Sequence, residues 1–189
     1  MNEIYLLTGN RGKLTIAQSV FSKFNITLKQ LSPKYPAIQA DTSLEVAKYA
    51  ALEAAKTEKV NVVREDHALF LDALGFPGPY TKFIEHALSV EKLIRIVDSL
   101  NERSGHFEIS AVYARPDGKF KEYSFSVPIN ISKEPRGSLS GLTGWNRALM
   151  LEGETRTFAE YDEKDRLNVW NHNFEKIAKD IITGVLDRL

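Results

Sequence analysis

Two kinds of spacing between apolar residues recur in the first third of the chain. Residues 14–24 and 44–54 carry apolar side chains three and four positions apart, which is typical of a helix with one buried face. Shorter apolar runs at 4–7, 26–31 and 60–63 indicate buried strands. Strands and helices therefore alternate here, which predicts βα units.

The boundaries of these elements carry their own signals. Thr42 followed by Glu45 is a capping box, so we expect the alanine-rich helix to begin there. The strand at 60–63 is expected to end where the polar residues Arg64, Glu65 and Asp66 begin.

The second half of the chain changes from helical spacing to strict alternation. Two helices are expected at about 79–87 and 90–100. Alternating apolar residues at 107–113 and 123–131 flank the turn sequence RPDGK, which predicts a β-hairpin. The last sixteen residues, FEKIAKDIITGVLDRL, predict a closing amphipathic helix. Its inward side chains are expected to be Ile177, Ile181, Ile182 and Val185.

A sheet that begins with βα units and ends with an antiparallel hairpin is a mixed sheet. We therefore predict an α/β protein, with a mixed β-sheet flanked by helices. At 189 residues the chain is long enough for one substantial core, so we expect a single domain over 1–189.

Composition excludes several classes of function. The 25 basic residues balance 25 acidic ones, so no overall field attracts nucleic acid or an anionic membrane. The chain has no cysteine, which excludes disulfides, thiolate metal ligands and a cysteine nucleophile. No basic leader and no apolar run of membrane-spanning length is present. We therefore expect a cytoplasmic enzyme or binding protein.

The segment TGNRGK, which follows the first expected strand, allows two interpretations. In the first, Asn10 caps the next helix and Gly9 makes the turn. In the second, the backbone N–H groups at the start of this helix hold a phosphate with the help of Lys13. The residue types alone leave both open.

The adjacent carboxylates Glu65 and Asp66 also allow two interpretations. Carboxylates at the carboxyl ends of strands in open α/β sheets commonly face the ligand crevice, and a pair of them suits a hard cation such as Mg²⁺. The same pair also fits a solvated turn.

Other candidates are more scattered. GFPGPYTK is a stiff turn, with Pro79 near the start of a helix that contains Lys82. Trp145, Glu160 and His172 are isolated in the sequence, and each is also explained by packing, a surface charge or a helix start.

Taken in order, these segments resemble the inosine triphosphate pyrophosphatase family, whose members hydrolyse noncanonical purine nucleoside triphosphates. TGNRGK matches the family's N-terminal motif, and EDHALFLDALGFPGPYTKF matches its most specific central segment. TGWNRALMLEGETRTFAE and NHNF match two later motifs less completely. The resemblance implies two lobes with a central nucleotide cleft, a nucleoside triphosphate substrate, Mg²⁺ as cofactor, and a homodimer.

The resemblance also implies roles for individual residues. Asp66 and Lys13 are the expected catalytic residues, and Asp66 with Glu65 the expected metal ligands. The residues expected to bind substrate are Thr8, Gly9, Asn10, Lys13, Lys82, Trp145 and His172.

Some positions depart from the family pattern. In the phosphate and metal half, Ala37 replaces an acidic ligand, Ala50 a lysine, and His67 a small hydroxyl residue. In the base-binding half, Thr143 replaces an aromatic residue, Asn146 an aspartate, and Asn173 an arginine. Three hypotheses follow: a pyrophosphatase with altered base preference, a catalytically impaired relative that binds a nucleotide or a partner protein, and a structural protein that binds no ligand.

Overall fold

The computed structural model describes the whole chain except residues 1–2, 33–34, 36–37, 139–143, 163–164 and 166–168. The chain forms two compact units. The first unit comprises Met1–Asp66, Ile109–Phe125 and Leu167–Leu189, and the second comprises His67–Glu108 and Ser126–Arg166.

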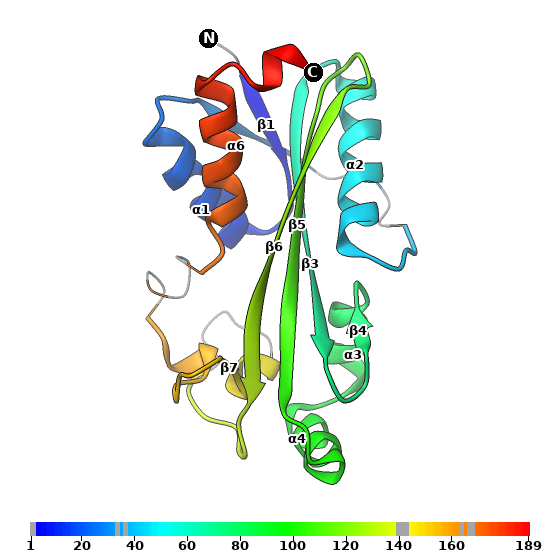
Figure 1. Ribbon diagram of the computed structural model, residues 1–189, viewed down its shortest axis with the longest axis vertical. Helices are drawn as coiled ribbons and strands as arrows, with labels where there is room; N and C mark the ends of the chain where they lie inside the picture. Colours follow the sequence, from blue (N-terminus) through cyan, green and yellow to red (C-terminus); the bar gives the residue numbers. More distant parts are fainter. Residues whose placement is uncertain (1–2, 33–34, 36–37, 139–143, 163–164, 166–168) are drawn as a thin grey trace. The chain divides into compact units, whose positions relative to one another are not determined.

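A mixed seven-stranded sheet organises the chain, which confirms the predicted fold class (Figure 1). The strands follow the order β2-β1-β3-β5-β6-β7, and β4 pairs with β3. The strands are β1 (Ile4–Leu7), β2 (Leu28–Leu31), β3 (Asn61–Leu71), β4 (Phe76–Gly78), β5 (Ser104–Ala114), β6 (Phe120–Ile131) and β7 (Leu149–Leu151). The helices are α1 (Arg11–Ser22), α2 (Ser43–Glu58), α3 (Thr81–Ala87), α4 (Val90–Leu100) and α6 (His172–Ile182), with 3₁₀ turns η1 (Gly144–Arg147), η2 (Phe158–Glu160) and η3 (Leu186–Arg188).

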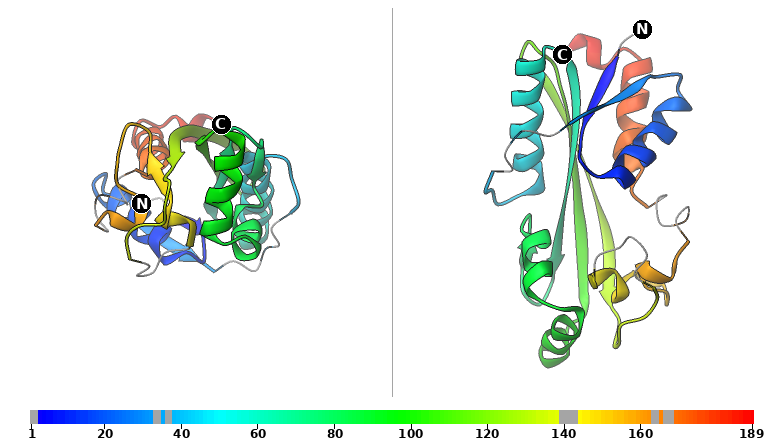
Figure 2. Two further views of the ribbon diagram at one scale, coloured as in Figure 1. Left: turned by 90° about the horizontal axis from the view of Figure 1, so that it is seen from below. Right: turned by 180° about the vertical axis from the view of Figure 1, so that it is seen from behind.

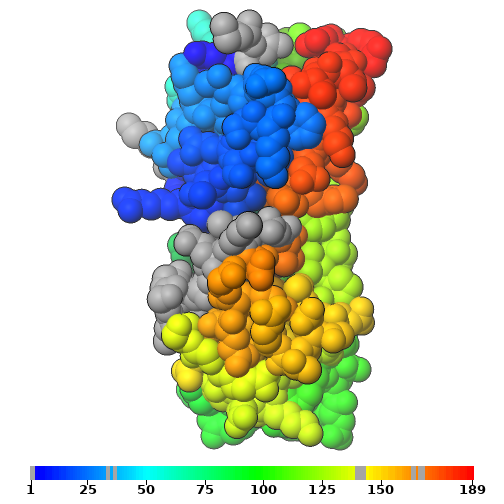
Figure 3. Space-filling view, turned by 90° about the vertical axis from the view of Figure 1, so that its left-hand side faces the viewer, coloured from blue at the N-terminus to red at the C-terminus, as the bar shows by residue number. Residues whose placement is uncertain are grey.

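In the first unit, helices cover both faces of the sheet. β1 pairs in parallel with β2 on one side and with β3 on the other, as the βα pattern predicts. Helices α1 and α6 lie side by side on one face, and α2 covers the other face (Figures 1 and 2). Figure 3 shows α1 in blue next to α6 in orange and red.

Each face has its own apolar cluster. Ile4, Leu6 and Val63 pack against α1 and α6, whereas Leu7 and Val62 pack against α2. This alternation follows from strand geometry, because consecutive side chains point to opposite faces of a sheet. It therefore also assigns a face to the residues that follow Val63 in β3.

The second unit is built on the hairpin of β3 and β4. Phe70 is paired with Pro77 in antiparallel register, and the peptide bond between Phe76 and Pro77 is cis. Helices α3 and α4 follow close to their predicted positions. β7 pairs in antiparallel fashion with the last residues of β6.

Several local predictions are confirmed and one is wrong in part. The box of Thr42 and Glu45 caps α2, and the alternating segments form β5 and β6. The closing helix is shorter than predicted, because α6 ends at Ile182 and a turn leads into η3. The side chain of Ile182 is 57% exposed, so the prediction that it points inward is wrong. Among the described residues, no helix combines the length and apolar character needed to cross a membrane.

Candidate functional site

The turn that joins β1 to α1 is held by its own side chains. The Oδ1 atom of Asn10 accepts a hydrogen bond from the Lys13 amide at 3.2 Å, which confirms that Asn10 caps α1. The buried Thr8 hydroxyl oxygen accepts a hydrogen bond from the Asn10 amide at 3.1 Å. Gln30 of β2 donates from its amide nitrogen to the Thr8 carbonyl at 2.9 Å. The turn is thus held by hydrogen bonds within the first unit.

These contacts leave main-chain donors available at the start of α1. Within the part of the chain that the structure describes, the amides of Gly9, Arg11 and Gly12 have no hydrogen-bond acceptor. Unpaired amides and the helix dipole together favour an anion at a helix N-terminus. The cap and the phosphate site are therefore compatible.

The acidic pair lies in the middle of a strand, so the prediction that β3 ends at Arg64, Glu65 and Asp66 is wrong. β3 continues to Leu71 because it pairs with β5 and its last three residues pair with β4. The neighbouring strand β1, in contrast, stops at Leu7, and its last paired residue, Leu6, is opposite Val63. The acidic pair therefore lies just past the paired residues of β1, although β3 itself continues.

Glu65 and Asp66 point to opposite faces of the sheet. Glu65 follows Val63 on the face covered by α1 and α6, and Asp66 follows Val62 and Arg64 on the face covered by α2. Their side chains are also unequally exposed, at 1% for Glu65 and 20% for Asp66. The two side chains therefore leave the strand on opposite faces, and metal binding by the pair stays a prediction.

Lys13 connects α1 to the acidic pair. Its Nζ atom donates to the Glu65 carbonyl oxygen at 3.2 Å and lies 3.8 Å from the Glu65 carboxylate oxygen Oε2. Burial lowers the pKa of Lys13 below its ordinary value, and the negative charges of Glu65 and Asp66 oppose this effect. An additional anion near the amine would favour its charged form further.

Arg64 is part of this site although the sequence analysis did not single it out. Its Nη1 atom donates to the Leu7 carbonyl oxygen at 3.0 Å, and its Nη2 atom lies 3.5 Å from Asp66 Oδ1. Its spacing from Asp66 was a signal in the sequence, because residues two apart in a strand lie on the same face.

The predicted residues of the second unit, Lys82 and Trp145, differ in exposure. Lys82 is exposed in the first turn of α3. Trp145 is 2% exposed, and its indole Nε1 donates to the Leu88 carbonyl oxygen at 2.7 Å. Its backbone amide also donates to Glu85 Oε1 at 3.0 Å. The indole thus has a packing role in the core of the second unit.

The residues at the start of α6 belong to the first unit. His172 is exposed, and its ring lies 4.9 Å from the Phe125 ring between centroids. Asn173 is fully buried, and its Nδ2 atom donates to the Ile109 carbonyl oxygen at 3.0 Å. Asn173 therefore bonds α6 to β5. The resemblance placed it where the family has a base-binding arginine, so this structural role was not expected.

The structure brings part of the predicted site together. Thr8, Asn10, Lys13 and Glu65 are linked by hydrogen bonds within the first unit. Ala50 is buried in the cluster between α2 and the sheet. Ala37 and Thr143 lie outside the described residues.

With this geometry in view, comparison with known proteins gives a clear assignment. The sequence profile of the Ham1 family matches residues 4–180. This chain belongs to the Ham1 family. The recognition made from the sequence motifs is confirmed.

Related sequences and structures agree with this assignment. A dITP/XTP pyrophosphatase of Ignicoccus hospitalis is 35% identical over 181 residues, covering 94% of this chain and 95% of the relative. A dITP/XTP pyrophosphatase of Thermococcus kodakarensis is 34% identical, covering 86% of this chain and 88% of the relative. The structure of a HAM1 protein from Coxiella burnetii matches with a TM-score of 0.78 at 21% identity, covering 100% of both chains.

The donor set of this Ham1 protein permits Mg²⁺ at Asp66. No group of three or more histidine, aspartate and glutamate residues that could hold a metal exists among the described residues. Mg²⁺, however, is commonly bound by one or two carboxylates together with substrate phosphates and water. The partly exposed Asp66 fits this mode of binding, whereas the Glu65 side chain is buried beside Lys13.

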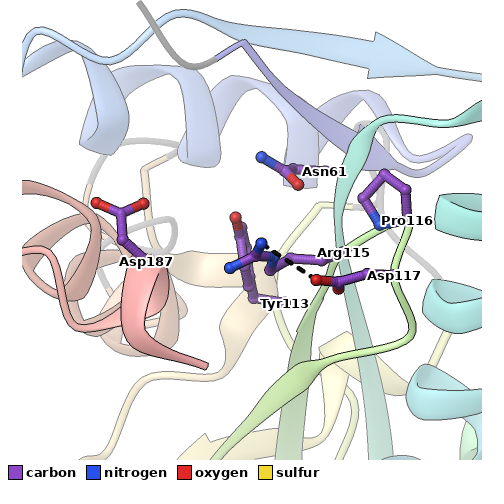
Figure 4. Close-up of a pocket in the computed structure, with 6 residues that line it drawn as sticks. All are labelled: Asn61, Tyr113, Arg115, Pro116, Asp117 and Asp187. Carbon is purple, nitrogen blue, oxygen red and sulfur yellow. Dashed lines mark ion pairs between the residues drawn. The ribbon is translucent and has the colours of Figure 1, made fainter.

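A pocket of about 430 Å³ in the first unit is lined by none of the predicted residues (Figure 4). Its lining residues are Asn61, Tyr113, Arg115, Pro116, Asp117 and Asp187. It lies beside the first residue of β3 and the hairpin turn after β5, so it is separate from the turn at Thr8. Arg115 and Asp117 form an ion pair at 3.1 Å within it.

Proposed function

We propose that this Ham1 protein is a nucleoside triphosphate pyrophosphatase. It would hydrolyse noncanonical purine nucleoside triphosphates to the monophosphate and pyrophosphate, with Mg²⁺. The observation that supports this proposal most strongly is the contact of Lys13 with Glu65. It places a cation from the start of α1 beside the strand residues that include Asp66. The relatives named dITP/XTP pyrophosphatase give the reaction class and the substrate class.

The residues of the first unit would divide the work as follows. The free amides at the start of α1 bind phosphate oxygens, and Lys13 neutralises charge that develops on them. The Asp66 carboxylate orients the attacking water and accepts its proton. Mg²⁺, held by Asp66, would supply further neutralisation of the phosphate charge. Hydrolysis cleaves the bond between the α-phosphorus and the bridging oxygen, and pyrophosphate leaves with that oxygen.

The remaining predicted contacts are part of the same proposal. Lys82 of the second unit is an exposed cation suited to a phosphate, and His172 of the first unit offers an exposed ring for a base. Trp145 is the weaker candidate, because its indole N–H is already bonded to Leu88.

One observation favours an altered base preference, as in the first hypothesis. The side chain of Asn173, which stands where the resemblance places a base-binding arginine, is turned into the core of the first unit and bonded to β5. Asn173 is therefore not available to a base in this arrangement. We expect the preference for inosine and xanthosine triphosphates over adenosine and guanosine triphosphates to be weak, with binding carried chiefly by the phosphates.

A homodimer is also part of the proposal. Phe76, Tyr80 and Phe83 of the second unit have exposed side chains and offer apolar surface for a second copy. Sedimentation equilibrium tests this directly, and a monomer at all concentrations would refute it.

The deciding experiment for function is a release assay with inosine, xanthosine, adenosine and guanosine triphosphates, with and without Mg²⁺. Pyrophosphate and phosphate are measured separately. Pyrophosphate release that requires Mg²⁺ is expected. Release of phosphate alone would indicate a different reaction, and no release from any nucleotide would favour the impaired relative.

A further inference from the structure

Arg64 is held at both ends of its guanidinium group. Nη1 is bonded to the carbonyl oxygen of Leu7, the residue directly before Thr8, and Nη2 faces Asp66. The guanidinium therefore connects the root of the turn at Thr8 to the carboxylate on the neighbouring strand. Arginine suits such a bridge because its donors are fixed in one plane, whereas a lysine amine is a single point of charge.

The Arg64 side chain is largely buried and, in the part of the chain that the structure describes, one of its donors has no hydrogen-bond partner. The side chain is only 20% exposed, and the buried Nε atom has no acceptor among the described residues. A buried donor without a partner is unfavourable and calls for an explanation. We infer that the contacts of Nη1 with Leu7 and of Nη2 with Asp66 offset the cost of burying the unpaired Nε donor.

We propose that Arg64 is a positioning residue for Asp66 in the pyrophosphatase reaction, so this inference rests on the proposed function. Arg64 holds the carboxylate at a fixed place relative to the carboxyl end of β1, where the phosphate-binding turn begins. It acts through that carboxylate: Nη1 donates to the Leu7 carbonyl oxygen, and Nη2 lies beside Asp66. The turn and the carboxylate are thereby kept in one geometry.

The chain contains a matched control for this inference. Arg115 lies two residues before Asp117, its Nη2 atom is 3.1 Å from the Asp117 carboxylate, and its Nη1 atom donates to the Leu186 carbonyl oxygen at 3.3 Å. It belongs to the same unit and has similar exposure, but it lines the pocket in Figure 4 rather than the turn at Thr8. Removing Arg115 therefore removes the same contacts away from the proposed site.

The test compares Arg64→Met, Arg64→Lys and Arg115→Met with the wild-type protein. The measurements are kcat and KM for pyrophosphate release from xanthosine triphosphate, and the affinity for inorganic tripolyphosphate without Mg²⁺. Arg64→Met should lower kcat about 10- to 100-fold, as loss of a residue that orients a catalytic ligand typically does. KM and tripolyphosphate affinity should stay close to wild type. Arg64→Lys should restore only part of kcat, and Arg115→Met should keep full activity.

Three results would overturn the inference: unchanged kcat in Arg64→Met, an equal loss in Arg115→Met, or a loss that appears as weaker tripolyphosphate binding. The last result would make Arg64 a phosphate ligand instead. If the wild-type protein releases no pyrophosphate, the proposed function fails, and crystal structures of the wild type and Arg64→Met decide the inference. A displaced Asp66 carboxylate in the variant supports it, and an unmoved one refutes it.

Discussion

The first unit contains two arginine and aspartate pairs with the same sequence spacing, and their surroundings differ. Arg64 and Asp66 lie within a strand, beside Lys13 and the turn at Thr8, with both side chains 20% exposed. Arg115 and Asp117 lie at a hairpin turn, where the aspartate is 45% exposed. The contacts of the two arginines are alike, so the ion pair itself does not define a site. What distinguishes the first pair is its position beside the largely buried Lys13 and a helix N-terminus, whereas the lysine beside the second pair, Lys119, is exposed.

The largest expected difference between the two pairs is catalytic. Asp66→Asn should reduce pyrophosphate release by about 10²- to 10⁴-fold, because the amide cannot accept a proton from water. Its melting temperature should change little, because the carboxylate is partly exposed and contributes little to folding. Asp117→Asn is the control and should retain full activity. Full activity of Asp66→Asn would remove this residue from the mechanism.

Hydrogen exchange compares anion binding near the two Arg–Asp pairs, and the measurement does not require catalytic activity. Tripolyphosphate should protect the amides of residues 8–13, by up to about 100-fold when the ligand exceeds its Kd 100-fold. The amides of Arg115 and of residues 117–119 are the internal reference and should exchange at the same rate with and without ligand. Protection at the hairpin turn but not at the start of α1 would leave the latter as a simple cap.

The third prediction concerns the lysine that distinguishes the first pair. Lys13→Met should lower the free energy of unfolding by about 1–3 kcal/mol, because the buried Glu65 loses a charged hydrogen-bonding neighbour. Lys119→Met, at the exposed hairpin turn, should change it by less than about 0.5 kcal/mol. Urea unfolding followed by circular dichroism measures both. Equal effects of the two substitutions would show that burial does not distinguish the two regions.

The smallest effect is expected at a third carboxylate of the first unit, Asp180, which tests whether an ion pair alone influences catalysis. Burial raises the pKa of Asp180, but hydrogen bonds from Lys121 and Tyr123 outweigh it and leave the pKa below its ordinary value. A lowered folded pKa means that the stabilisation is present above the unfolded value of 3.8 and is lost as the pH falls through the folded value.

Asp180→Asn should therefore cost about 0.5–1.5 kcal/mol of unfolding free energy at pH 7, and less near pH 3. The activity at pH 7 should be unchanged. Denaturant unfolding at the two pH values measures the difference, and a cost that is the same at both would contradict the assigned pKa direction.

The elements most accurately predicted from the sequence are those with local signals. The turn RPDGK and the capping box of Thr42 specify their own geometry within a few residues, and both occur as expected. The length of β3 could not be predicted in this way. It depends on pairing with β4 and β5, and the polar residues Arg64 to Asp66 look like the end of a strand when only their neighbours in the sequence are considered.

The sequence identified most residues of the candidate site, but it did not predict which side chains face each other or which ones pack into the core. The sequence places Glu65 and Asp66 next to each other, and only the strand assigns them to opposite faces. Arg64 was missed because its partners, Leu7 and Asp66, define its role only after β1 and β3 are paired. Asn173 could not be identified as a structural residue, because its partner Ile109 is distant in the sequence.

The turn between β1 and α1 has a consequence for how such sites evolve. Its side chains at Thr8 and Asn10 bond to the chain itself, while the donors offered to an anion belong to the main chain. A substitution at Thr8 or Asn10 would therefore alter anion binding by changing the course of the main chain, in addition to any contact that its side chain makes with the ligand. Sequence change in this turn is therefore limited by the shape of the main chain as well as by the chemistry of the ligand.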